Sequence, residues 1–175
     1  MNKKIEEAIN KQINEELFSE YIYLSIAAYA DYKNLKGFAQ WFTVQAKEER
    51  DHAMGFYLHL LERGGQVKLE AIKKPPATFG KPVDMFTLAL KHEKYITDKI
   101  NKLYELARKE KDYAFESFVK WYIDEQVEEE ATASEWLEKL KMAGDKPNII
   151  MMIDKELEAR QYTPGGPQAT GATEE

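Results

Sequence analysis

The stretch QAKEERDHA, residues 45–53, decides the fold of this chain. It places Glu49 and His52 three positions apart, and residues i and i+3 of a helix share one face. Because Glu-x-x-His alone is a weak motif, the surroundings of Glu49 carry more weight. Positions seven or eleven residues apart differ by only about 20° around a helix. Glu49 has large apolar residues at all four of these positions, namely Phe38, Phe42, Phe56 and Leu60.

The same spacing test finds one such glutamate in each of three other helical stretches. These acids are Glu16, Glu93 and Glu129. Their apolar neighbours at the two spacings are Ile5, Ile9, Tyr23 and Ala27 for the first, Phe86, Ile100 and Tyr104 for the second, and Phe118, Tyr122, Trp136 and Leu140 for the third. Most other glutamates lack such neighbours. Each long helix therefore carries one acid in the middle of its apolar stripe.

Proline and glycine divide the chain into helical segments. Long helices are expected over about residues 2–32, 38–63, 82–109 and 112–142, and a short apolar one over residues 148–160. Short turns join the first pair and the second pair, so each pair is antiparallel. The connection QVKLEAIKKPPATFGKP, residues 66–82, is long enough to cross the length of a bundle, and its prolines forbid a continuous helix. The segment QYTPGGPQATGATEE, residues 161–175, has the composition of disorder.

The four stripe acids predict bound cations. A single acid on an apolar stripe is usually a tolerated edge position or a hydrogen-bonded group. Four are different, since each unpaired buried carboxylate costs several kcal/mol and a domain is stable by only about 5–15 kcal/mol. No matching set of Lys or Arg lies on these stripes. All four acids lie near mid-helix, and four carboxylates with one imidazole and no sulfur suit about two iron or manganese ions better than a structural zinc.

Composition excludes several other classes of protein and site. The net charge of −6 argues against a nucleic-acid partner. There is no cysteine, which removes disulfides and thiolate metal sites. No apolar run approaches the roughly 18 residues of a membrane span, and the polar first residues do not resemble a signal peptide. A cytoplasmic protein without a membrane partner is expected.

Four segments in combination resemble the bacterial and archaeal non-haem ferritins. They are LFSEYIY (17–23), QAKEERDHA (45–53), LKHEKYI (90–96) and WYIDEQVEEE (121–130). The resemblance spans about residues 3–160. It implies an all-α fold, a ferritin-like four-helix bundle with one long crossover connection and a short fifth C-terminal helix. Residues 1–160 would form the ferritin-like di-iron domain, and residues 161–175 a disordered tail.

The resemblance also implies a set of metal ligands. They are Glu16, Glu49, His52, Glu93, Gln126 and Glu129. One iron would bind Glu16, Glu49 and His52. The second would bind Glu49, Glu93 and Glu129, with Gln126 close by. Glu49 would then bridge the two ions.

Further residues match the family with open alternatives. Tyr23 resembles a tyrosine beside the di-iron site that supplies an electron, although an ordinary core aromatic fits its spacing equally well. Trp121 is a weaker candidate for that role. The residues that match a third iron site are Glu48, Glu125 and Glu128. A solvated acidic face is the alternative for these three.

The chain departs from related families at informative positions. Gln126-x-x-Glu129 replaces a second Glu-x-x-His, which is typical of ferritins rather than bacterioferritins. Bacterioferritins carry a haem-ligating Met beside the bridging Glu, where this chain has Arg50, so no haem is expected. Rubrerythrins need cysteines that are absent here. His59 and His92 have no Glu three residues before them and are interpreted as ordinary surface or interface residues.

The implied function is iron storage with ferroxidase activity. Fe(II) would be oxidised with O2 at two irons per chain, with a possible third, and Fe(III) stored as a mineral inside a homo-oligomeric shell of twenty-four subunits. Two alternatives share parts of this pattern. A di-iron oxidase or peroxidase that stores nothing would use the same ligands. A non-catalytic helical interaction module would leave the four stripe acids unexplained.

Overall fold

The computed structural model describes residues 1–167, which form five α-helices. Their bounds are α1 (Lys3–Tyr32), α2 (Lys36–Glu62), α3 (Pro82–Glu110), α4 (Tyr113–Ala143) and α5 (Pro147–Leu157). The predicted all-α bundle is confirmed. Each expected end of a long helix lies within two residues of the observed end. None of the helices in this described part is both long and apolar enough to cross a bilayer.

Local chemistry explains where the helices begin. The Asn2 side chain accepts a hydrogen bond from the backbone of Lys4 and caps α1, and the Asp112 side chain does the same for α4 through Phe115. Pro82 opens α3, where its missing N–H costs no hydrogen bond. These features fix the starts of α1, α3 and α4 within one residue of the positions that the sequence pattern favours.

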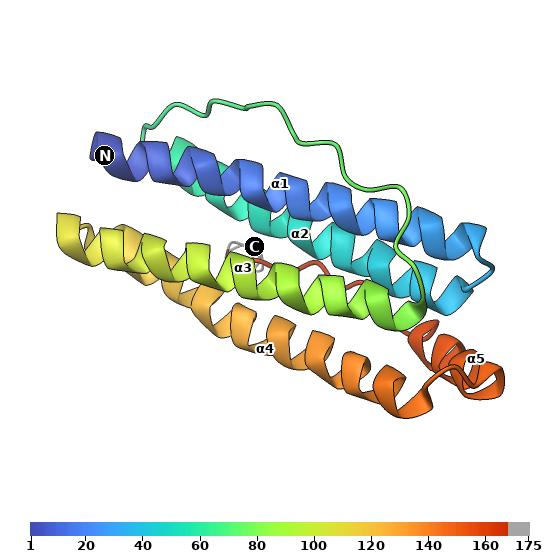
Figure 1. The fold of residues 1–175 in the computed structure, drawn as a ribbon. Coiled ribbons are helices and arrows are strands. Elements are labelled where there is room, and N and C mark those ends of the chain that lie inside the picture. Colours follow the sequence, from blue (N-terminus) through green and yellow to red (C-terminus); the bar gives the residue numbers. More distant parts are fainter. Residues whose placement is uncertain (168–175) are drawn as a thin grey trace, which may run out of the picture.

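The long helices form two antiparallel hairpins, α1 with α2 and α3 with α4 (Figure 1). The connection between α2 and α3 runs along α1 from one end of the bundle to the other. The helix α5 closes one end and packs on α2. Gly37 permits this approach, because a Cβ there would lie 1.6 Å from the backbone oxygen of Asp154. The Asp154 side chain also accepts a hydrogen bond from the backbone N–H of Phe38.

The core consists of two hydrophobic clusters with a polar layer between them. One cluster includes Ile26, Phe42 and Phe86 near the α5 end, and the other includes Ile9 and Phe56 near the opposite end. Along each long helix the apolar residues of the two clusters are separated by one or more buried polar residues. The polar layer comprises Gln12, Glu16, Ser19, Gln45, Glu49, His52, His92, Glu93, Gln126 and Glu129. The bundle therefore brings the four stripe acids to one level.

The segment that follows α5 turns back along α2 (Figure 1). The Tyr162 hydroxyl donates to Asp51 Oδ2 at 2.6 Å, and the Gly165 backbone N–H donates to the same oxygen at 3.2 Å. Lys47 Nζ lies 5.3 Å from the centre of the Tyr162 ring. Two residues of the expected tail, Tyr162 and Gly165, thus have partners on α2. The remainder of that expected tail, residues 168–175, lies outside the described residues.

Candidate metal centre

Each long helix contributes one buried carboxylate to the polar layer. Glu16, Glu49, Glu93 and Glu129 are at most 7% exposed, and His52 is 4% exposed. Because the apolar stripe of each helix faces the bundle axis, the acid in the middle of that stripe faces it too. The expectation that these residues share one level agrees with their common burial between the two apolar clusters.

The ligands expected for the first iron lie together. Glu16, Glu49 and His52 each offer one ligand atom, and these atoms lie within 4.8 Å of one another. His52 Nδ1 is 3.6 Å from Glu49 Oε2. Two glutamines hold the carboxylates from one helical turn away, at position i−4. Gln12 Nε2 donates to Glu16 Oε1 at 2.7 Å, and Gln45 Nε2 donates to Glu49 Oε1 at 3.2 Å.

The ligands expected for the second iron are arranged less simply. Glu93 accepts hydrogen bonds from the Tyr23 hydroxyl and, at 3.3 Å, from Gln126 Nε2. Glu129 accepts one from Gln45 Nε2 at 2.7 Å. Glu49, Glu93 and Glu129 do not form a group with all ligand atoms within 4.8 Å, among the residues described. Because a carboxylate has about four lone-pair sites, Glu93 can keep the hydrogen bonds from Tyr23 and Gln126 and still bind an ion.

A second group with ligand spacing extends toward the surface of the bundle. It consists of His52, Glu125 and Glu129. Glu125 Oε1 is 4.0 Å from His52 Nε2, and the Glu125 side chain is 30% exposed. The Glu48 side chain is 22% exposed, whereas Glu128 is exposed. The three residues expected at a third iron site thus range from half-buried to solvated.

Burial and mutual repulsion raise the pKa of the four central carboxyls. Burial first, and then the charge of Glu49, raise the pKa of Glu16 and of Glu93 to about 8. Burial and the neighbouring Glu93 raise the pKa of Glu129 to about 8. Burial and Glu129 raise the pKa of Glu49 well above its usual range. No lysine or arginine is buried within residues 1–167, so no protein cation lies among these four carboxyls.

The donor set fits a hard cation. Glu16 Oε2 is buried and receives no hydrogen bond from any of the described residues. An unpaired buried acceptor is costly, and a divalent ion bound to it removes that cost. Four carboxylates and one imidazole are ligands that iron accepts. The residues of the polar layer therefore supply ligands that are able to hold Fe(II).

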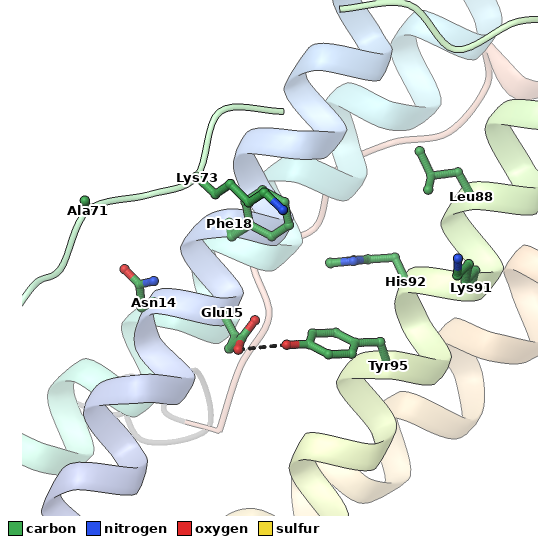
Figure 2. Close-up of a pocket in the computed structure, with 9 residues that line it drawn as sticks. All are labelled: Asn14, Glu15, Phe18, Ala71, Lys73, Leu88, Lys91, His92 and Tyr95. Atoms are coloured by element: carbon green, nitrogen blue, oxygen red, sulfur yellow. Dashed lines mark hydrogen bonds between the residues drawn. The ribbon is translucent and has the colours of Figure 1, made fainter. Parts of the chain in front are cut away.

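His59 and His92 differ from the prediction of surface or interface positions. They are only 9% and 8% exposed. The His59 ring stacks on Phe118 with 4.0 Å between ring centres. His92 Nε2 lies 2.8 Å from Ser19 Oγ, and Figure 2 shows His92 pointing into the space between α1 and α3, at a pocket beside the crossover. Burial lowers the pKa of both imidazoles to about 4.

The spacing test missed three polar residues that hold the site. Gln12 and Gln45 lie four positions before a stripe acid, and this i, i+4 relation is a signal that could have found them. Arg160 contacts Gln45 from outside the bundle, with 2.9 Å between its Nη1 and Gln45 Oε1. Nothing in the sequence pattern indicates that contact, because it depends on the path of the chain after α5.

Comparisons with known proteins agree with this geometry. A family model for the ferritin-like domain matches residues 6–143. A bacterial non-heme ferritin of Staphylococcus epidermidis is 39% identical over 162 residues, which cover 93% of this chain and 98% of the relative. A closed form of the Archaeoglobus fulgidus ferritin, engineered by site-directed mutagenesis, is 45% identical with a TM-score of 0.92, covering 93% of this chain and 99% of that one. An open-pore ferritin of the same archaeon is 45% identical with a TM-score of 0.91, over 92% and 99% of the two chains.

Proposed function

This chain belongs to the family of bacterial and archaeal non-haem ferritins, and on that premise we propose that it oxidises Fe(II) at a di-iron site inside its own helix bundle. It is an iron-storage protein of this family. One observation carries the proposal. Four buried carboxylates from four helices surround the bundle axis, and one of them has an oxygen without any hydrogen-bond partner among the described residues.

Fe(II) is the substrate of the proposed reaction. The first ion binds Glu16, Glu49 and His52, and the second binds Glu49, Glu93 and Glu129 with Gln126 beside it. Two Fe(II) supply two electrons, which with two protons from solvent reduce O2 to the level of hydrogen peroxide. Carboxylates are hard ligands that stabilise Fe(III) relative to Fe(II), so the ligand set itself favours oxidation. The protein contributes the position of the two ions and the negative charge that draws them together.

Tyr23 is proposed as a source of one further electron, which together with a fourth electron from a third Fe(II) completes the four-electron reduction of O2 to water. It is 1% exposed, and its hydroxyl donates a hydrogen bond to Glu93. Burial and the nearby Glu93 raise the pKa of the Tyr23 phenol well above its usual range, so the phenol keeps its proton. When the phenol loses an electron it also releases this proton, and the Glu93 carboxylate is placed to accept it. No comparable hydrogen bond links Trp121 to a ligand in the described residues.

A third, weaker iron site is proposed at Glu48, Glu125 and Glu128. Burial raises the pKa of the Glu125 carboxyl, and repulsion by Glu128 adds to this shift. Glu48 and Glu125 also repel each other. Such mutual repulsion on the half-exposed side of the site is relieved by a cation. An ion held there would lie on the route by which oxidised iron leaves the di-iron site.

Anaerobic titration with Fe(II) tests the proposal directly. We expect two ions per chain to bind tightly, because the layer holds four central carboxylates. A third ion should bind more weakly, since its ligands are partly solvated. Calorimetry gives both the stoichiometry and the affinities without any oxidation. Fewer than two ions per chain would contradict the di-iron assignment.

We further propose that the chain assembles in the cytoplasm into a hollow homo-oligomeric shell of twenty-four subunits, with Fe(III) stored inside as a mineral. Large apolar side chains lie exposed on α5 and the crossover, including Met151, Met152 and Leu69. Contact between subunits would cover them. Light scattering should give a mass near twenty-four times the chain mass of 20.3 kDa. A monomer or dimer would favour a di-iron oxidase that stores nothing.

A further inference from the structure

The segment after α5 carries an arginine to the edge of the metal centre. Arg160 follows the helix by three residues, and its backbone oxygen accepts a hydrogen bond from Gln40 Nε2 at 3.0 Å. Its guanidinium lies 4.3 Å from the centre of the Trp41 ring. The side chain is 21% exposed, so it is fixed against α2 rather than extended into solvent. These contacts place one permanent positive charge at this edge of the polar layer.

The guanidinium contacts two residues of the centre at once. Its Nη2 is 2.5 Å from Glu48 Oε2, and its Nη1 is 2.9 Å from Gln45 Oε1. Gln45 in turn donates to Glu129 and Glu49. Arg160 is therefore linked to two of the proposed ligands through one residue, Gln45. By accepting from Arg160, the Gln45 oxygen is turned outward and its NH2 group is directed at the carboxylates.

Glu48 cannot serve a metal ion and Arg160 equally well. The Arg160 guanidinium lowers the cost of the Glu48 charge, while Glu125 raises it. A third ion bound by Glu48 and Glu125 would bring a second positive charge close to the guanidinium. The guanidinium and the ion are both positively charged, and two like charges next to the same carboxylate repel strongly in a partly buried site. The ion pair and the third ion are therefore alternatives.

We propose that Arg160 is a built-in competitor of the third iron: its guanidinium neutralises Glu48 until a metal ion displaces it. The proposal rests on the proposed function, since it concerns the weak site beside the di-iron pair. Displacement would release the Arg160 side chain from α2 and free the Gln45 amide. Arg160 acts through Glu48 and Gln45 and is thus a positioning residue that sets the affinity of the third site.

The experiment is an anaerobic Fe(II) titration of the full chain by calorimetry, with Arg160→Gln compared to the parent. The third ion should bind about tenfold more tightly in Arg160→Gln, since a hydrogen bond between charged groups contributes roughly this factor. The two tight ions should keep their affinities. Arg160→Lys keeps the charge but cannot reach Gln45 and Glu48 together. Its affinity for the third ion should therefore lie between that of the parent and that of Arg160→Gln. This variant also provides the test if Arg160→Gln does not fold.

Two further variants separate the specific ion pair from net charge. Arg50→Gln removes a guanidinium from α2, the helix that carries Glu48; Arg50 lies 3.4 Å from Glu20 and forms no ion pair with Glu48. It should leave the third-ion affinity unchanged. In a Glu48→Gln background, Arg160→Gln should have a smaller effect, because the carboxylate for which arginine and metal compete is gone.

If Arg160→Gln binds the first two ions as the parent does, an unchanged or lower affinity for the third ion would disprove the competition between Arg160 and that ion. An equal gain in third-ion affinity in Arg50→Gln would also disprove the competition, since the change in net charge alone would then explain the result. If the proposed function itself is wrong, the titration of the parent gives a different result. In that case the parent itself would bind no tight pair of ions, whatever ions Arg160→Gln binds.

Discussion

Glu49→Ala is expected to lower the initial rate of Fe(II) oxidation by at least about 100-fold, since even residues that only support metal ligands are worth about 10–100-fold. Glu49 is the one residue assigned to both irons. One of its carboxylate oxygens lies within 4.8 Å of a ligand atom of Glu16 and of His52, and Glu49 is only 2% exposed. Its loss removes the bridge between the ions as well as part of the negative charge that attracts them. Stopped-flow measurement of the first turnover, at two Fe(II) per chain, gives this rate.

The control for this variant is Glu62→Ala, which removes an exposed carboxylate from the end of the same helix. It should oxidise iron at the parent rate. The melting temperature of Glu49→Ala without metal should be equal to or above that of the parent, because a repelling buried carboxylate has been removed. This result would exclude unfolding as the cause of the lost activity. Oxidation by Glu49→Ala at near the parent rate would disprove the bridging role.

The spacing of four glutamates predicts their burial in one polar layer inside the bundle. Each lies in the middle of an apolar stripe, and a stripe has to face the bundle axis to bury its aromatic and aliphatic residues. The level of the acids follows from their mid-helix positions. The helix ends were predictable from proline, glycine and capping residues, which act locally. For these features the sequence alone contains the physical cause.

Side chains that depend on a partner from a distant segment could not be predicted. His92 is buried because α1 packs over it and Ser19 offers a hydrogen bond. His59 is buried because Phe118 of α4 stacks on it. Neither histidine repeats the pattern of a stripe acid, so spacing gave no indication of their burial. Arg160 is the clearest case, since its contact with Glu48 depends on the turn of the chain after α5.

The composition of residues 161–167 predicts disorder, and it does not indicate the hydrogen bonds that two residues of this segment make to α2. Proline and glycine are abundant there, and apolar periodicity is absent. Asp51 nevertheless accepts two hydrogen bonds from this segment, one from the Tyr162 hydroxyl and one from the Gly165 backbone. Composition reports whether a segment can form its own core, and it contains no information about a docking partner on a helix surface.

Stability should depend on pH and metal in a way that reports the buried carboxylates. Without metal, the melting temperature is expected to fall as the pH rises from about 5 to about 8. The unfolded carboxyl has a pKa near 4.5, whereas burial and repulsion raise the folded pKa of Glu16, Glu93 and Glu129 to about 8. Between these values the folded state binds more protons than the unfolded state. The stabilisation is therefore complete below the lower pKa and is lost as the pH rises through the higher one.

A divalent ion should reverse this trend, because it binds the ionised carboxylates that repel one another. At 100 times its dissociation constant, one ion adds about 2.7 kcal/mol to the free energy of unfolding, which raises the melting temperature by several degrees. The measurement is thermal unfolding by circular dichroism at pH 5, 6, 7 and 8, with chelator or with anaerobic Fe(II). Guanidinium is added to bring the transition into range. Glu129→Gln should show a shallower fall with pH in chelator, since one of the titrating groups is gone, and a smaller gain from Fe(II). Melting curves that are independent of pH in chelator and unchanged by Fe(II) would mean that the four acids do not form a preformed metal centre.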